Sequence, residues 1–279
     1  MTYPIVYTDL DGTLLDHNTY AWDQARETLE LLRTSHTPLV FVSSKTRLEI
    51  ETLRRIFDNS DPFIPENGGA VYLPEACGLA APASARQVEG YRVIVLGAGL
   101  KEIAEKFDRL ARDFPIRAFS RMPTAEAAAL VGLGLEEARA AQQREYGEAF
   151  LFTREGVSLP AFEAAAGRLG LHVTQGGRLY HLLAGNDKGR AVRLLTGLYR
   201  EKYGRVMTIG VGDAPNDEPL LAAVDLAYQV ARPDGSHARL VVPEISRMSG
   251  IGSVGFSQAV LDGLARVFKQ RQYDPLSAT

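Results

Sequence analysis

The sequence has 279 residues and a mass of 30.4 kDa, which favours one large domain or two modest ones. Hydrophobic residues make up 46% and charged residues 23%, a balance that disfavours disorder, collagen and coiled coil. The net charge of −3 gives no general attraction to nucleic acid, and the single cysteine, Cys77, excludes an internal disulfide and a cysteine-rich zinc site. No apolar stretch is long enough to span a bilayer and no signal peptide is recognisable. We therefore expect a cytoplasmic protein, a monomer or homodimer, with no nucleic-acid and no membrane partner.

The first third of the chain alternates between strand and helix patterns. Residues 5–8 and 39–42 are short apolar runs that end in polar residues, as buried strands do. Residues 22–34 and 46–57 carry apolar side chains at helical spacing. Apolar strands separated by helices predict a parallel sheet that is covered on both faces.

The same alternation returns at residue 188, after a middle region of a different kind. Helical spacing covers 188–203 and 254–270, a short helix includes Leu220 and Leu221, and strands are predicted at 206–211, 226–230 and 240–242. The middle predicts strands at 91–96, 116–119 and 149–153, helices at 100–113, 124–143 and 159–169, and a hairpin of 171–174 with 178–183. We therefore predict a discontinuous α/β core of residues 1–84 and 186–279, with an inserted α+β domain of residues 85–185.

Acidic side chains follow two of the predicted core strands. Asp9 and Asp11 come after the first strand, and Asp213 comes after the strand at 206–211. Ligands of open α/β sheets bind at the carboxyl ends of strands, so we expect these carboxylates to converge. Carboxylates at such short distances repel each other unless a cation lies between them. A site that offers only oxygen ligands favours Mg²⁺. The sequence thus predicts Mg²⁺ bound by Asp9, Asp11 and Asp213, with Asn216 and Asp217 in the surrounding loop.

A phosphate group is the ligand expected beside such a cation. Lys188 begins a predicted helix and would supply a positive charge, while Ser43 at the end of the second strand would supply a hydroxyl donor. Ser44 is the alternative to Ser43. Backbone amides from Leu10 to Gly12 would add further donors, since glycine permits a tight turn.

The two carboxylates of the first segment have different expected tasks. A carboxylate held against a phosphate is a competent nucleophile and gives an aspartyl-phosphate. We expect Asp9 to take this role because it lies closer to the end of the strand. Asp11 is then the acid for the leaving oxygen and the base for water, and its backbone carbonyl is a further metal-ligand candidate.

These residues resemble the four motifs of the haloacid dehalogenase-like phosphatases. Residues 9–14 (DLDGTL) resemble the first motif, Ser43 the second, Lys188 the third and residues 212–217 (GDAPND) the fourth. The resemblance implies a Rossmann-like core and Mg²⁺-dependent phosphoryl transfer. The insertion between the second and third motifs resembles the C2 cap of the Cof-type (IIB) sugar-phosphatase branch, and residues 66–69 (ENGG) resemble a turn of that branch.

Three further segments are similar to mannosyl-3-phosphoglycerate phosphatases: residues 43–47 (SSKTR), 144–150 (REYGEAF) and 177–182 (GRLYHL). The resemblance implies hydrolysis of mannosyl-3-phosphoglycerate to mannosylglycerate, a compatible solute. A glucosyl substrate stays open, because Gly147 and Ala149 stand where that family more often carries Ser and Pro. Such a substrate has a carboxylate that Lys45, Arg144 and Arg178 could bind, and sugar hydroxyls that Glu148 or His181 could bind. The candidate substrate-binding residues are Lys45, Arg47, Glu66, Asn67, Arg144, Glu148, Gly177, Arg178 and His181.

Several alternatives remain at this point. A broad sugar phosphatase, a phosphomutase with a second phosphate site in the cap, and a non-catalytic sugar-phosphate sensor share the expected fold. The turn Glu66–Gly68 is also typical of a simple hairpin. Residues 250–255 match GxGxxG, but they lie near the C-terminus, no strand is predicted before them and no acidic residue closes a βαβ unit after them, so we reject a dinucleotide site. We expect His17, His36, His172 and His237 to be solvent-exposed or packing residues.

Overall fold

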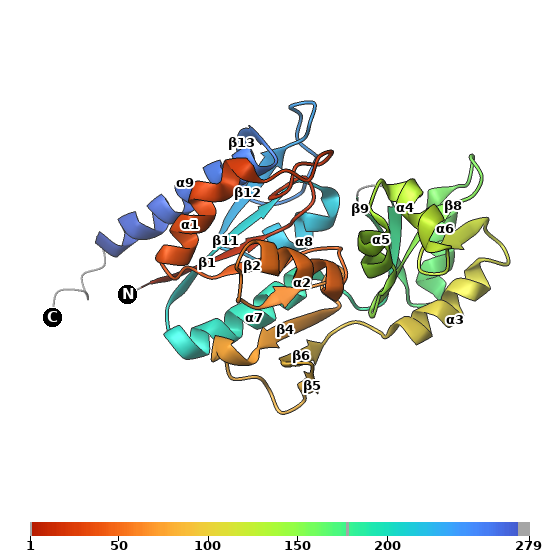
Figure 1. Cartoon of the computed structure of the whole chain (residues 1–279), viewed down its shortest axis with the longest axis horizontal. Helices are drawn as coiled ribbons and strands as arrows, with labels where there is room; N and C mark the ends of the chain where they lie inside the picture. Colours follow the sequence, from red (N-terminus) through yellow and green to blue (C-terminus); the bar gives the residue numbers. More distant parts are fainter. Residues whose placement is uncertain (1, 177–178, 273–279) are drawn as a thin grey trace.

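The computed structural model describes residues 2–176 and 179–272 and contains two β-sheets (Figure 1). The larger sheet has the strand order β13-β12-β11-β1-β2-β3-β4-β6-β5, and its strands from β13 to β3 are parallel. An α/β core with a parallel sheet is therefore confirmed. The strands of this sheet are β1 (Tyr3–Thr8), β2 (Leu39–Val42), β3 (Phe63–Ile64), β4 (Ala70–Pro74), β5 (Arg86–Val88), β6 (Tyr91–Val95), β11 (Val206–Gly212), β12 (Leu226–Ala231) and β13 (Ser246–Ile251).

Helices cover both faces of this sheet because the central strands are apolar on both sides. In β1, Val6 belongs to the core cluster on one face, whereas Ile5 and Tyr7 belong to the cluster on the other. The Tyr7 hydroxyl lies 2.8 Å from the Thr196 hydroxyl, so this buried polar group of the strand has a hydrogen-bond partner. The first face is covered by α1 (Arg26–Thr34), α2 (Arg47–Ile56) and α9 (Ser253–Gln272), and the second by α7 (Lys188–Tyr203) and α8 (Glu218–Leu221).

The smaller sheet belongs to a separate unit that stands beside the core (Figure 1). It is antiparallel, with the order β7-β8-β10-β9, and it includes the predicted hairpin. Its own core contains Phe107, Phe150 and Phe162. The elements of this unit are α3 (Leu100–Leu110), β7 (Ile116–Ala118), α4 (Thr124–Val131), α5 (Leu135–Gln142), β8 (Gly147–Phe152), α6 (Leu159–Arg168), β9 (His172–Gly176) and β10 (Leu179–Leu183).

The division at residues 84 and 185 stays a prediction, and the strand order indicates a different first boundary. Strands β5 and β6, which lie inside the predicted insertion, pair with β4 of the large sheet. Since a sheet is one hydrogen-bonded unit, these strands extend the core. We place the start of the inserted domain after β6 instead of at residue 85.

One predicted strand is wrong. Residues 240–242 form no strand, and Leu240 packs in the core from an irregular segment. The edge strand is β13, which the pattern missed because its residues, SRMSGI, are mostly polar or small, as an edge strand with a single partner allows. The match to GxGxxG therefore begins at the end of a strand, so the expectation that no strand leads into it is wrong. Its glycines allow close packing, since a Cβ on Gly255 would lie 2.3 Å from the Gly250 carbonyl oxygen.

The two crossings between the core and the inserted unit meet at Asn186. The Asn186 amide nitrogen donates to the carbonyl oxygens of Glu66 and Tyr146, both at 2.9 Å. Gly97, on the outgoing crossing, packs so closely that a Cβ there would lie 2.3 Å from Oδ1 of Asn186. A Cβ on Gly68 would lie 2.3 Å from the carbonyl oxygen of Asp187. The turn after β3, both crossings and the start of α7 thus form one tightly packed junction.

In the described residues, no helix combines the length and the apolar character that crossing a membrane requires.

Candidate active site

The predicted acidic residues converge where the parallel strands end. Asp9 follows β1, Asp213 follows β11, and Asp217 ends the short 3-10 helix at Pro215–Asp217. One carboxylate oxygen from each of the three lies within 4.8 Å of the others, and all three residues are buried. They meet because β1 and β11 are neighbours in register, with Thr8 opposite Val211.

Lys188 joins two of these carboxylates. Its ammonium donates to Oδ1 of Asp9 at 2.8 Å and to Oδ1 of Asp217 at 2.6 Å, and the side chain is 1% exposed. The second oxygen of Asp217 accepts from the backbone N–H groups of Asp213 and Ala214. Asp217, predicted as a residue of the surrounding loop, therefore stands inside the charged cluster and fixes the turn that presents Asp213.

The cluster holds more negative charge than its single lysine balances. Burial is the main cause that raises the pKa of Asp9, and repulsion from Asp217 adds to it, while Lys188 opposes both. Burial and repulsion from Asp217 likewise raise the pKa of Asp213 to about 7. A divalent cation would relieve this repulsion.

The loop after β1 is shaped to fit Asp213. Gly12 has a φ of +80°, and a Cβ on it would lie 2.8 Å from Oδ2 of Asp213. The hydroxyl of Thr13 donates to Oδ1 of Asp213 at 2.9 Å, a contact that the sequence analysis missed. Thr13 is part of the first motif, so its position was visible but its partner, 200 residues away, was not. Leu10 is fully buried, and its carbonyl accepts from the N–H groups of Thr13 and Leu15.

The donor set fits a hard divalent cation. Oxygen is the only donor type, and carboxylate oxygens are ligands that Mg²⁺ favours. Asp9, Asp213 and Asp217 form the group that could hold it, whereas the predicted ligand Asp11 is not in this group. Instead, the Asp11 carboxylate pairs with the ammonium of Lys45 at 3.0 Å.

The cluster opens into a cavity of about 780 Å³ between the core and the inserted unit. The core contributes Asp9, Asp11 and Asp213 to its lining, and β9 and β10 contribute residues from the opposite side. Other predicted site residues that line this cavity are Ser44, Lys45, Arg144, His181 and Asn216. Lining residues absent from the predicted site set include His17, Tyr20, Thr174, Gln175, Gly176 and Arg232.

Three predicted substrate-binding residues make contacts at the junction between the core and the inserted unit and do not line the cavity. The fully buried Glu66 accepts from the N–H groups of Glu145 and Tyr146 at 2.7 and 3.0 Å. Arg47 pairs with Glu145 at 3.0 Å, and Asn67 lies 3.5 Å from Asn216. Neither Glu66, Arg47 nor Asn67 lines the cavity. Glu66 and Arg47 thus hold the core against the segment that precedes β8, whereas Asn67 contacts another core residue.

The remaining predicted residues divide between the cavity wall and the interior. Ser43 is 1% exposed and its hydroxyl accepts from the N–H of Lys45, so Ser44, the alternative, is the serine that lines the cavity. Glu148 is buried and accepts from the backbone N–H and the hydroxyl of Ser120. Gly177 and Arg178 lie outside the described residues.

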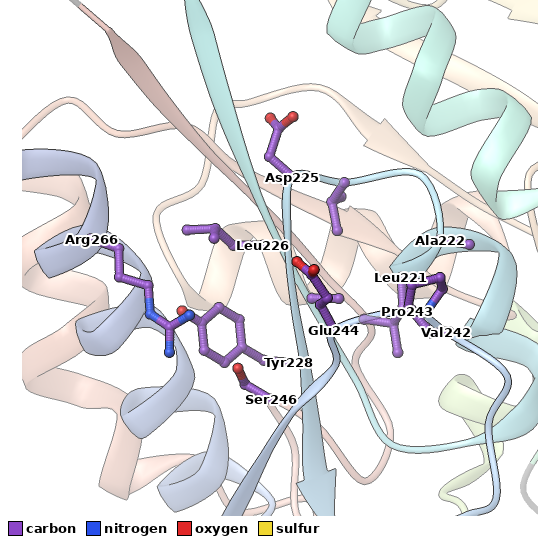
Figure 2. A pocket seen from close by; sticks show the side chains of 12 residues that line it. Leu221, Ala222, Asp225, Leu226, Tyr228, Val242, Pro243, Glu244, Ser246 and Arg266 are labelled. Carbon is purple, nitrogen blue, oxygen red and sulfur yellow. The ribbon is translucent and has the colours of Figure 1, made fainter. Parts of the chain in front are cut away.

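A second cavity, of about 300 Å³, lies elsewhere on the core (Figure 2). Its lining includes Tyr228 and Arg266, which both bind Asp262 at 2.8 Å. None of the predicted site residues is in this lining, so the acidic cavity is the candidate active site.

Comparison with known proteins gives one matching family and several similar relatives. The family described as haloacid dehalogenase-like hydrolase matches residues 6–88. A glucosyl-3-phosphoglycerate/mannosyl-3-phosphoglycerate phosphatase of Methanococcoides burtonii is 37% identical over 261 residues, covering 92% of this chain and 96% of the relative. A protein of the same name from Persephonella marina is 34% identical over 258 residues, covering 92% of this chain and 95% of that relative.

The fold is shared with solved structures of lower identity. A sugar phosphatase of subclass IIB of the haloacid dehalogenase superfamily superposes with a TM-score of 0.58 at 13% identity, covering 96% of this chain and 99% of that one. The similarity extends over the core and the inserted unit together. The chain therefore belongs to the haloacid dehalogenase-like hydrolases, and it is a phosphoric monoester hydrolase.

Proposed function

We propose that the enzyme hydrolyses a hexosyl-3-phosphoglycerate, with mannosyl-3-phosphoglycerate as the first candidate and the glucosyl compound as the alternative, in a Mg²⁺-dependent reaction. The observation that carries the proposal is the buried cluster of Asp9, Asp213, Asp217 and Lys188, which adjoins a cavity with both polar and apolar lining residues. The names of both relatives include these two substrates. We also propose that the enzyme is cytoplasmic and that the substrate reaches it as a free small molecule.

The first step transfers the phosphoryl group to Asp9. An oxygen of its carboxylate attacks phosphorus, the bond to the glycerate oxygen breaks, and an aspartyl-phosphate forms. The Lys188 ammonium, held by Asp9 and Asp217, stabilises negative charge on the phosphoryl oxygens. Mg²⁺ bound by Asp9, Asp213 and Asp217 would neutralise further charge on the phosphate when present.

The proton transfers are assigned to Asp11. It donates a proton to the leaving oxygen, and as a carboxylate it accepts one from the water that hydrolyses the aspartyl-phosphate. Lys45 is 3.0 Å from Oδ1 of Asp11 and 3.7 Å from Glu49, and Glu49 forms a capping box with Thr46 at the start of α2. Lys45 therefore orients Asp11 from a rigid helix end.

The cavity wall offers neutral polar groups for a sugar. Thr174 Oγ1, His181 Nδ1 and Asn216 Oδ1 are buried and have no hydrogen-bond partner within the described part of the chain. His181 and Asn216 both lie close to Gly176: a Cβ added to this glycine would lie 3.5 Å from Nε2 of His181 and 3.6 Å from Nδ2 of Asn216. Buried polar groups without partners are costly, and sugar hydroxyls would satisfy them. Burial, Arg144 and Lys188 lower the pKa of His181, so its ring is neutral at pH 7.

The test is phosphate release from synthetic mannosyl- and glucosyl-3-phosphoglycerate, beside a panel of hexose phosphates. We expect kcat/KM to be highest for one of the two hexosyl-phosphoglycerates, with Asp9→Asn as the inactive control and a dependence on added Mg²⁺. Comparable values across the panel would indicate a broad sugar phosphatase. Phosphate retained in an isomerised sugar phosphate would indicate a phosphomutase, and no turnover of any ester would indicate a sensor.

A further inference from the structure

The loop after β12 places an arginine in the active-site cavity. Arg232 directly follows this strand, is partly buried, and lines the same cavity as Asp9 and Asp213. The loop is closed by two hydrogen bonds of 2.8 Å, from Arg232 N–H to the Ser236 carbonyl and from Gly235 N–H to the Arg232 carbonyl. Because β12 is the neighbour of β11, which leads into Asp213, Arg232 is held next to the phosphoryl-transfer centre by the core itself.

Within the described residues, the other lysine and arginine side chains of this cavity and its acidic cluster already have anionic partners. Lys188 binds Asp9 and Asp217, and Lys45 binds Asp11. Arg144 lies 3.5 Å from Glu66, and its guanidinium also donates to the carbonyl oxygens of Ser44 and Gly147. Using Lys45 or Arg144 for a substrate carboxylate would therefore break contacts that hold Asp11 or the junction in place.

Arg232 differs from these residues. Within residues 2–176 and 179–272, its guanidinium has no ion pair within 4.0 Å and no side-chain hydrogen bond. The nearby carboxylate of Asp234 is bound to the N–H and hydroxyl of Ser236, at 2.9 and 2.7 Å. That hydrogen bonding is the main cause that lowers the pKa of Asp234, and the charge of Arg232 contributes least. A guanidinium without an acceptor, on a fixed loop beside a phosphate site, is suited to bind a second anion of the substrate.

We propose that Arg232 binds the carboxylate of the glycerate group and so selects phosphate esters that carry a carboxylate. The planar guanidinium can donate two parallel hydrogen bonds to a carboxylate, which an ester with a neutral hydroxymethyl group cannot accept in the same way. This inference rests on the proposed function. It assigns binding of the carboxylate to a core residue that no sequence motif indicated, instead of to Lys45 and Arg144.

The experiment compares two inhibitors that differ only in this group. Hydrolysis of p-nitrophenyl phosphate by the Mg²⁺-loaded enzyme is inhibited competitively with 3-phosphoglycerate and with glycerol 3-phosphate, and the ratio of the two Ki values measures selection for the carboxylate. We expect wild type to prefer 3-phosphoglycerate, and Arg232→Gln to lower the ratio about 10- to 100-fold, as the loss of a charged hydrogen-bonded contact predicts. Arg232→Lys should retain part of the preference. The matched control is Arg239→Gln, an exposed arginine of the same segment that does not line the cavity, and it should keep the wild-type ratio.

Failure of this inference is separable from failure of the proposed function. The inference is overturned if wild type shows no preference, if Arg232→Gln keeps it, or if Arg178→Gln removes it and Arg232→Gln does not. The proposed function is overturned if wild type hydrolyses other sugar phosphates but neither hexosyl-3-phosphoglycerate, whatever the inhibitor ratio shows.

Discussion

Replacing Glu66 by alanine tests whether the turn after β3 holds the inserted unit to the core. The change leaves the N–H groups of Glu145 and Tyr146 without their acceptor and removes the carboxylate 3.5 Å from Arg144. Breaking a buried ion pair costs about 3–5 kcal/mol, and each unsatisfied donor about 1–3 kcal/mol. Burial raises the pKa of Glu66, so part of this cost is offset when the buried carboxylate is removed. These costs overlap, since each includes the penalty of leaving a buried group unpaired, and we expect a net loss of about 3 kcal/mol in the free energy of unfolding and a fall of about 6–10 °C in Tm.

The assay is urea unfolding at pH 7.5, with Glu137→Ala as the matched control. Glu137 also accepts a backbone N–H, from Gly134 at 2.8 Å, but it lies on an exposed helix start. Its loss should cost about 1 kcal/mol or less. A Glu66→Ala variant as stable as this control would refute the reasoning. A raised KM without any loss of stability would instead support the prediction from the sequence that Glu66 binds the substrate.

The other predictions concern the active site. Asp9→Asn should lower kcat by more than about 10³-fold while the variant still folds, as measured by phosphate release and circular dichroism. Gly12→Ala should weaken Mg²⁺ binding, measured by calorimetric titration, because its Cβ would lie 2.8 Å from Oδ2 of Asp213 and a φ of +80° costs an alanine about 1–2 kcal/mol. The pKa of His181 is lowered in the folded protein, mainly by burial. Below about pH 6.5 the unfolded chain therefore binds a proton at this ring more readily than the folded protein does, and the free energy of unfolding decreases as the pH is lowered. His181→Gln should therefore make the stability fall less as the pH is lowered from 6.5 to 5, measured by urea unfolding at both pH values; an unchanged pH dependence would contradict the buried neutral ring. Chelation with EDTA should abolish turnover, and excess Mg²⁺ should restore it; full activity after exhaustive chelation would exclude the proposed metal dependence.

The central strands and the acidic residues at their ends were predictable because the same local sequence pattern indicates both. A short apolar run predicts a buried strand, and the polar residue that ends it must lie at the sheet edge, as Asp9 and Asp213 do. The strand β13 and the strand pair β5–β6 were not assigned correctly, because pairing partners decide them and local hydrophobicity does not. Sequence patterns show that a segment is extended, but they do not show which sheet it joins.

Within the site, residue type was predictable and residue partnership was not. Lys45, Glu66 and Arg144 are charged residues in segments that resemble phosphatase motifs, so binding to the substrate was the natural expectation. The structure gives each of them a partner far away in sequence: Arg144 is 78 positions from Glu66, and Lys45 is 34 from Asp11. Arg232 had no motif to mark it, and only its place beside Asp213 makes it a candidate.

The packed junction at Asn186 bears on how the enzyme could be re-engineered. An inserted unit from a relative with another sugar preference can be exchanged as a cassette only if the junctions leave Gly68, Gly97 and Asn186 native, since each packs closely against the opposite crossing. Lys188 lies two residues beyond Asn186, so a graft joined inside this junction would also displace the Lys188 ammonium from Asp9 and Asp217. Swaps joined just outside it, within residues 98–185, should change selectivity and spare the chemistry.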